Sequence, residues 1–249
     1  MPLMLTPARQ PAGAPSVLRA APTLCRALLL LAASLLVPPA HAQDEPPATS
    51  PETWTAAVYE AWKDRVIQVR VVDRQAGGKA GIGSGFIAGR AGWVVTNYHV
   101  IAELLNEPGR FEVSYLSDTG AEGPMTLVAV DAVHDLALLR AEGLAPEPLA
   151  LADAVPSRGA RLWSMGYPFD IGLTIVQGSF SGRLQRSLYD RLHFTGSINP
   201  GMSGGPALDA QGAVVGVNVS TAGNQVSFLV PVRFVHDLLR SAAEAGKPA

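Results

Sequence analysis

Short segments with β-strand patterning, separated by glycine-rich or polar turns, fill most of the chain after Asp64. The first is VIQVRVV, in which apolar and polar residues alternate well. It is followed by IGSGFIA, WVVTNYHV, FEVSYLS, TLVAVDA, LALLRAE, RLWSMGY, TIVQGSFSGRL, LHFTGSI, AVVGVNVS and VSFLVPV. Many short strands punctuated by Gly, Pro and Asp are typical of a sandwich or a barrel. The sequence therefore predicts an all-β fold.

Two segments beside these strands have helical periodicity. In TWTAAVYEAWKD, Trp54, Val58 and Trp62 recur at helical spacing, which predicts a short amphipathic helix. In PVRFVHDLLRSAAEAG, Pro231 suits a first helical turn, and the apolar stripe after it predicts a C-terminal helix that covers the β body.

The first 42 residues resemble a secretory signal peptide. They contain three arginines and no acidic residue, then the apolar run ALLLLAASLLV, which is short for a membrane span. Ala40-His41-Ala42 follows as an A-x-A cleavage site, so we expect cleavage after Ala42, with an uncleaved anchor helix as the alternative. The long basic segment before the apolar run leaves the true start codon open. Residues 43–52 are polar and proline-rich, which predicts a disordered leader.

Charge and cysteine content restrict the partners and the compartment. Without residues 1–42 the chain has 207 residues, with 16 Lys and Arg against 21 Asp and Glu, a formal net charge of −5. This charge argues against a nucleic-acid partner. The one cysteine, Cys25, lies in the signal segment, so the mature chain has no disulfide. We expect a periplasmic or secreted protein with no membrane contact after signal cleavage.

A serine among glycines is the first candidate for chemistry. INPGMSGGPALD places Ser203 in a tight turn, but a serine hydroxyl needs an adjacent base to act as a nucleophile. GMSGG also fits G-x-S-x-G, the nucleophile elbow, which requires a strand, a turn and a helix, with the acid and the histidine after the serine. Here GPALDAQGAVVGVNV continues as strand, turn and strand, and only 46 residues follow Ser203. We therefore reject the elbow.

The histidines of the mature chain supply a candidate base. None of His99, His134, His193 and His236 pairs with another at metal-ligand spacing, so we expect no metal and no cofactor. His193 falls in a strand pattern and His236 in the C-terminal helix, which favours structural roles. His99 lies where a buried strand runs into a short helix near Tyr98.

Asp135 directly precedes the buried segment LALL, so its carboxylate needs hydrogen-bond partners. A common role for such a residue is to accept backbone N–H bonds at the start of a strand. His134 is not expected to be its partner, because neighbouring strand residues point to opposite faces.

The chain order His99, Asp135, Ser203 completes a family pattern. Together with GIGSGFI, WVVTNYHVI, HDLALL, GYPFDIGLTIVQGSFSG and FTGSINPGMSGGPALDAQGAVVGVN, it resembles a trypsin-like serine protease of the HtrA/DegP type. The resemblance covers roughly residues 66–232, within a protease domain at 53–249.

The resemblance implies a fold and a mechanism. It implies two perpendicular six-stranded β-barrels, at about residues 65–150 and 151–232, with the site between them. His99 matches the general base, Asp135 the acid that orients it, and Ser203 the nucleophile. The backbone N–H groups of Gly201 and Ser203 match the oxyanion hole. The expected activity is a serine endopeptidase that hydrolyses protein or peptide substrates through an acyl-enzyme, without a cofactor.

Two departures from the family pattern qualify this expectation. Met202 precedes the nucleophile where digestive relatives carry an aspartate that pairs with a newly cut N-terminus. Met202 cannot form that ion pair. The sequence therefore leaves open which contacts hold the oxyanion hole. We also expect no PDZ domain after the protease domain. A peptide-binding or scaffolding module that keeps the fold without turnover, and hydrolysis of a non-protein ester or amide, remain alternatives.

Specificity and assembly are less constrained. The position six residues before the nucleophile is Ser197, where tryptic enzymes carry an aspartate, and the other candidate pocket residues are apolar or small. These are Val217, Asn218, Val219 and Ser227. We expect cleavage after small or medium apolar residues.

Trp54, Tyr59 and Trp62 either pack on their own domain or hold a trimer together, so monomer and trimer both stay open.

Overall fold

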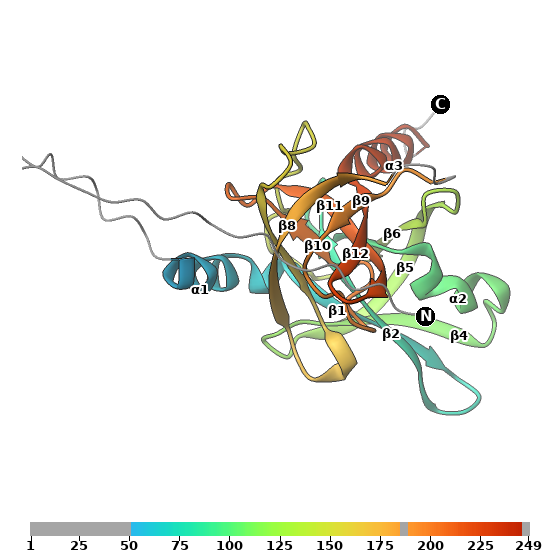
Figure 1. Ribbon diagram of the computed structural model, residues 1–249. Helices are drawn as coiled ribbons and strands as arrows, with labels where there is room; N and C mark the ends of the chain where they lie inside the picture. Colours follow the sequence, from blue (N-terminus) through green and yellow to red (C-terminus); the bar gives the residue numbers. More distant parts are fainter. Residues whose placement is uncertain (1–50, 185–188, 246–249) are drawn as a thin grey trace, which may run out of the picture. The chain divides into compact units, whose positions relative to one another are not determined.

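The computed structural model describes residues 51–184 and 189–245, and their strands form two closed antiparallel barrels (Figure 1). The signal peptide predicted at 1–42, and residues 43–50 of the predicted leader, lie outside the described residues. The prediction of an all-β fold with two six-stranded barrels is confirmed. No helix in the described residues is long and apolar enough to cross a membrane.

The first barrel has the strand order β1-β2-β3-β6-β5-β4. Its strands are β1 (Val66–Asp73), β2 (Gly78–Ile87), β3 (Trp93–Thr96), β4 (Phe111–Leu116), β5 (Glu122–Asp131) and β6 (Leu136–Ala141). A 3-10 turn, η2 (Tyr98–Ile101), and the short helix α2 (Ala102–Asn106) follow β3. The helix expected near Tyr98 therefore begins at that residue.

The second barrel has the order β10-β11-β12-β9-β8-β7. Its strands are β7 (Arg161–Gly166), β8 (Thr174–Arg183), β9 (Leu192–Phe194), β10 (Pro206–Leu208), β11 (Val214–Gly223) and β12 (Val226–Pro231). A 3-10 turn, η3 (Pro168–Asp170), lies in the loop between β7 and β8. The continuation of the nucleophile segment as strand, turn and strand is thus present as β10 and β11.

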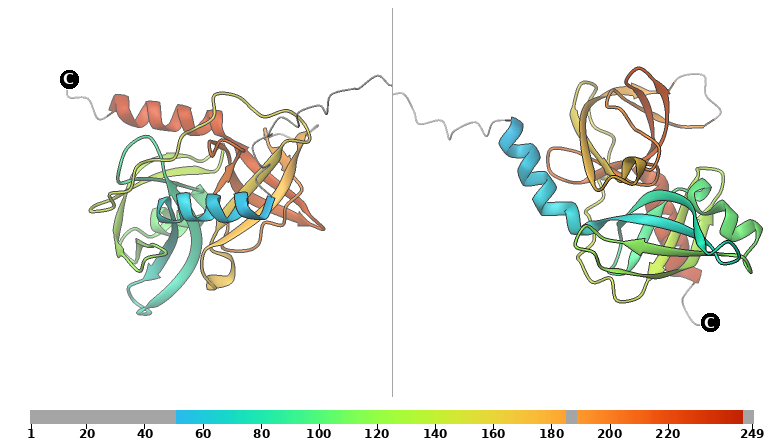
Figure 2. Two further views of the ribbon diagram at one scale, coloured as in Figure 1. Left: turned by 90° about the vertical axis from the view of Figure 1, so that its left-hand side faces the viewer. Right: turned by 90° about the horizontal axis from the view of Figure 1, so that it is seen from below.

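Helix α1 (Pro51–Trp62) contacts both barrels (Figure 2). Val58 is almost fully buried, the indole N–H of Trp163 in the second barrel donates to Thr55 Oγ1 at 3.2 Å, and the Tyr59 hydroxyl reaches Asp118 of the first barrel at 3.4 Å. The turn η1 (Lys63–Arg65) leads from α1 into β1. The helix begins at Pro51, two residues before the predicted boundary, because proline is tolerated in a first helical turn.

Helix α3 (Val232–Ala245) leaves the second barrel and packs along β5 and β6 of the first (Figure 2). It begins one residue after Pro231, which still pairs with Gly216 as the last residue of β12. Val235 and Leu238 bury the apolar side of α3 in a core that both barrels share. Each barrel also has a core of its own. The shared core fixes the first barrel against the second and so positions the residues at their junction.

Candidate active site

The turn that carries Ser203 lies between β9 and β10 and is held from both barrels. Gly204 N–H donates to Asn218 O at 2.9 Å, and Asn218 N–H donates to Gly205 O at 2.9 Å, both within the second barrel. From the first barrel, the N–H of Ser84 on β2 donates to Ser203 O at 2.8 Å. Ser203 is therefore fixed at the barrel junction, with its side chain partly exposed.

His99 and Asp135 meet on the first barrel. The ring Nδ1 of His99 lies 2.8 Å from Asp135 Oδ2, and the backbone N–H of His99 donates to Asp135 Oδ1 at 2.9 Å. The His99 side chain is 48% exposed and that of Asp135 is 18% exposed. The carboxylate is thus sheltered behind an imidazole whose other face is open, an arrangement in which an acid fixes the tautomer and orientation of a base.

Asp135 takes an unusual backbone conformation to make these bonds. Its φ is 61°, in the left-handed region that Asp tolerates better than most residues. The side-chain amide of Asn97, which is fully buried just before η2, donates to the Asp135 carbonyl oxygen at 2.8 Å. Asn97 therefore holds the main chain of Asp135 while the carboxylate faces His99.

The Ser203 hydroxyl points to a backbone carbonyl. Its Oγ donates to Val219 O at 3.3 Å, and no hydrogen bond joins Ser203 to His99 within the described part of the chain. Hydrogen bonds of this kind are often long or unformed without substrate. The Ser203 side chain would therefore have to rotate before it could pass a proton to His99.

Two backbone N–H groups beside Ser203 are available for an anion. Within residues 51–184 and 189–245, those of Gly201 and Ser203 donate to no backbone acceptor. Pro200 O accepts Phe169 N–H at 2.9 Å, and Ser84 Oγ donates to Gly201 O at 2.7 Å. Because the peptide is trans, the Gly201 N–H points away from Phe169.

Only glycine fits position 201. Its φ is +97°, and a Cβ there would collide with the carbonyl oxygen of Tyr167. A side chain would therefore displace the peptide that carries the Gly201 N–H.

Met202, directly before Ser203, contributes core packing and no polar side chain. Its side chain is fully buried in the core of the second barrel, and its N–H donates to Asn199 O at 3.0 Å. The Asn218 side-chain amide donates to Met202 O at 3.2 Å and to Met165 O at 3.1 Å, while Ser164 Oγ donates to Asn218 Oδ1 at 2.8 Å. The turn is thus held by Asn218 and by apolar packing.

The predicted pocket residues divide into two groups. Ser197 is exposed and Val219 is partly exposed, so both can face a bound peptide. Val217 belongs to the shared core, and Asn218 and Ser227 are fully buried in hydrogen bonds, Ser227 Oγ to the Ile198 N–H at 3.1 Å. The second group supports the turn from behind.

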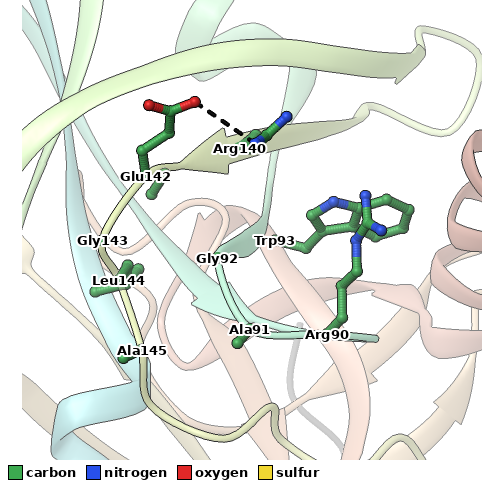
Figure 3. A pocket seen from close by; sticks show the side chains of 10 residues that line it. Arg90, Ala91, Gly92, Trp93, Arg140, Glu142, Gly143, Leu144 and Ala145 are labelled. Atoms are coloured by element: carbon green, nitrogen blue, oxygen red, sulfur yellow. Dashed lines mark ion pairs between the residues drawn. The ribbon is translucent and has the colours of Figure 1, made fainter. Parts of the chain in front are cut away.

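The other histidines make their own contacts. His134 Nδ1 lies 2.6 Å from Asp131 Oδ2, so His134 is paired away from Asp135, as expected. His236 on α3 lies 3.2 Å from Ala152 O, and His193 is on β9 beside Phe228. A cavity of about 710 Å³ lies beside Trp93, with Arg90 stacked on its ring (Figure 3). None of its lining residues belongs to the candidate site.

One charged residue near the site, Arg191, stands in no sequence motif that would have predicted its place there. Arg191 immediately precedes β9 and is partly buried. Burial lowers the pKa of its guanidinium, and the negative charges of Asp135 and Asp190 act in the opposite direction. The charge of Arg191 in the second barrel is therefore close enough to interact with that of Asp135 in the first.

The comparisons with known proteins agree with this geometry. A family model described as a trypsin-like peptidase domain matches residues 83–217, more than half of the chain, and includes His99, Asp135 and Ser203. The chain belongs to the trypsin-like peptidase family.

The relatives of this trypsin-like chain belong to the HtrA/Deg group, so the predicted resemblance is confirmed. It is 30% identical over 184 residues to Protease Do-like 5, chloroplastic, of Arabidopsis thaliana, covering 65% of this chain and 57% of the relative. It is 31% identical over 202 residues to Serine protease HTRA2, mitochondrial, of Bos taurus, covering 74% and 43%. The chain therefore spans about half the length of these relatives.

Solved structures support the fold. The crystal structure of Deg5 aligns with a TM-score of 0.66 and 24% identity, covering 79% of this chain and 97% of that one. The serine endoprotease from Yersinia pestis aligns with a TM-score of 0.66 and 22% identity, covering 77% and 67%.

Proposed function

We propose that this chain is a serine endopeptidase with His99 as general base, Asp135 as its orienting acid and Ser203 as nucleophile. The observation that carries the proposal is the double contact of Asp135 with His99, at the ring Nδ1 and at the backbone N–H. A carboxylate in this position holds the imidazole with Nε2 free to accept a proton. The names of the relatives, which are proteases, support the same reaction class.

The reaction follows from these groups. As Ser203 Oγ attacks the peptide carbonyl carbon, its proton passes to His99 Nε2, and Asp135 stabilises the imidazolium. The carbonyl oxygen becomes an oxyanion, which the N–H groups of Gly201 and Ser203 stabilise by about 3 kcal/mol for each donor. The C–N bond then breaks, and the leaving amine takes the proton from His99. Water, deprotonated by His99, hydrolyses the acyl-enzyme.

The substrates proposed are exported proteins, since residues 1–42 resemble a signal peptide and indicate a periplasmic or secreted location. Ser197 and Val219 offer no negative charge to a bound side chain, which favours small or medium apolar residues before the cleaved bond.

A fluorophosphonate probe tests the proposal. We expect covalent labelling of the purified protein, no labelling of Ser203→Ala, and labelling of His99→Ala slowed by a factor of about 100 or more. A wild-type protein that stays unlabelled, or a Ser203→Ala variant labelled equally, would overturn it. Peptide substrates with alanine, valine or arginine before the cleaved bond report specificity in the same assay, and selective cleavage after arginine would contradict the apolar preference.

The contact between the Ser203 hydroxyl and Val219 O favours a second candidate, a peptide-binding module that does not turn over. It predicts that an unfolded protein binds with measurable affinity while both hydrolysis and probe labelling stay absent.

A further inference from the structure

Residues 167–172, in the loop between β7 and β8, have a strained backbone. Phe169 and Asp170 are consecutive non-glycine residues with φ of 51° and 63°. Left-handed conformations of such residues persist only where surrounding contacts hold them. The apolar side chains of Phe169 and Ile171 do not provide these contacts, because they are 58% and 75% exposed, and the buried Tyr167 and Pro168 precede the strained residues.

Polar contacts from the first barrel hold the loop instead. Gln68 Nε2 on β1 donates to Asp170 Oδ1 at 2.7 Å, and Lys79 Nζ on β2 donates to Asp170 Oδ2. Gln68 is almost fully buried, and its Oε1 accepts the Nε–H of Arg70 at 2.7 Å. The hydrogen bond from Lys79, and then that from Gln68, lowers the pKa of Asp170, so the carboxylate is charged at neutral pH. One aspartate thus ties a loop of the second barrel to two strands of the first.

The same loop contacts the peptide that precedes the candidate oxyanion donor. Phe169 N–H donates to Pro200 O at 2.9 Å, and Tyr167 N–H donates to Ser84 Oγ at 2.9 Å. Ser84 Oγ in turn donates to Gly201 O at 2.7 Å. The orientation of the Pro200–Gly201 peptide therefore depends on where residues 167–169 lie.

We propose that Asp170 is a positioning residue: by joining the 167–172 loop to Gln68 and Lys79, it keeps the Phe169 N–H on the Pro200 carbonyl and the Gly201 N–H turned toward the oxyanion. The inference rests on the proposed peptidase function and identifies what holds the oxyanion hole where Met202 supplies no polar side chain. Without the contact of Asp170, the Pro200–Gly201 peptide is free to rotate, and its carbonyl oxygen would repel the developing negative charge.

This role predicts a loss of transition-state stabilisation with little loss of substrate binding. Removing one oxyanion donor outright typically lowers kcat by about 10² to 10³. We expect Asp170→Ala to lower kcat for a peptide amide by about 10-fold to 100-fold, with KM changed less than about 2-fold, because the donor is misplaced for part of the time. Binding of a peptide boronate, which mimics the tetrahedral intermediate, should weaken by the same factor as kcat.

Matched variants separate an effect on the position of the Gly201 N–H from an effect on the stability of the whole protein. Asp170→Asn keeps an acceptor for Gln68 and should be intermediate, and Lys79→Met should resemble it. Glu112→Gln is the control, because Glu112 also forms a partly exposed ion pair on the first barrel, with Arg74 at 2.9 Å, far along the chain from the loop. It should leave kcat, KM and boronate affinity unchanged, and all variants should melt close to the wild type.

The proposal is overturned if Asp170→Ala keeps wild-type kcat and boronate affinity, or if only KM changes. Failure of the peptidase function itself has a different signature, a wild-type protein that neither hydrolyses peptides nor reacts with the fluorophosphonate. In that case the amide resonance of Gly201 in nuclear magnetic resonance spectra still decides about Asp170. A Gly201 resonance that shifts in Asp170→Ala but not in Glu112→Gln supports the link between Asp170 and the Pro200–Gly201 peptide. A resonance that is unchanged in Asp170→Ala refutes this link.

Discussion

At the scale of single residues, the candidate acid depends on a neighbour that carries no charge. Asp135 bonds both the backbone N–H and the ring Nδ1 of His99 only because its backbone adopts a φ of 61°. Asn97 is the fully buried group that holds the Asp135 carbonyl in that conformation, at 2.8 Å. Loss of this amide would leave a carbonyl without its partner next to the acid.

We predict that Asn97→Ala lowers kcat about 10-fold with little change in KM. An unsatisfied buried acceptor costs about 1–3 kcal/mol, and the Asp135 backbone can relax to avoid that cost only by moving the carboxylate away from His99. Steady-state hydrolysis of a peptide substrate measures the effect, and thermal melting checks the fold. Asn106→Ala, an exposed change at the end of α2, is the control. Equal kcat for Asn97→Ala and wild type would contradict the role.

The sequence identified some residues of the site and missed others for a physical reason. His99, Asp135 and Ser203 stand in recognisable motifs, and the structure brings His99 and Asp135 into contact. Asn218 was assigned to the pocket wall, yet its side chain turns inward and holds the carbonyl of Met202. A register irregularity between Asn218 and Ser220 interrupts the alternation from which side-chain direction is predicted. Bulges of this kind leave no local composition signal.

At the scale of elements, strand positions were predictable and helix packing was not. The strands follow the β-patterned segments because alternation reports a half-buried strand directly. The packing of α1 depends on residues distant in sequence, such as Trp62 over Gly212. The sequence therefore left packing on its own domain and an oligomer contact open, and the structure supplies contacts of the first kind through Val58 and Thr55.

Gly212→Ala tests whether α1 docks in solution. Gly212 has a φ of +80°, and a Cβ there would collide with the Trp62 indole. We predict a loss of unfolding free energy of about 1–2 kcal/mol from the backbone plus a further cost from the collision. In a Trp62→Ala background only the backbone cost should remain, so a double-mutant cycle by urea unfolding should give a coupling energy of about 0.5–3 kcal/mol.

Gly77→Ala is the matched control for this cycle. Gly77 has a φ of +65° and open space around it, so its cost should not depend on Trp62. If Gly212→Ala also lowers the free energy of unfolding by the same amount with and without Trp62, α1 does not dock on this turn.

At the scale of the whole molecule, the stability of the protein is linked to pH through buried and paired carboxylates. Asp73, at the end of β1, accepts two hydrogen bonds from Arg110, at 2.7 and 3.0 Å on Oδ2, and backbone bonds from Gln75 and Ala76 on Oδ1. The bonds from Arg110 are the largest cause that lowers the pKa of Asp73 from 3.8 to about 2. The folded chain therefore binds this proton more weakly than the unfolded chain does.

The sign of the pH dependence follows from that difference. Between about pH 4 and pH 2 the unfolded chain takes up a proton at Asp73 while the folded chain does not, so acid favours unfolding. Above about pH 4 Asp73 is ionised in both states, and its contribution to the free energy of unfolding is constant.

We predict that Asp73→Asn lowers the free energy of unfolding at pH 7, and that the difference in this free energy between the variant and the wild type shrinks as the pH falls toward 2. Urea unfolding at pH 7, 4, 3 and 2 measures this difference, with the exposed Asp153→Asn as control. A difference that stays constant over this range would mean that the Asp73 carboxylate keeps its ordinary pKa in the folded protein, and that Arg110 stabilises the end of β1 through packing alone.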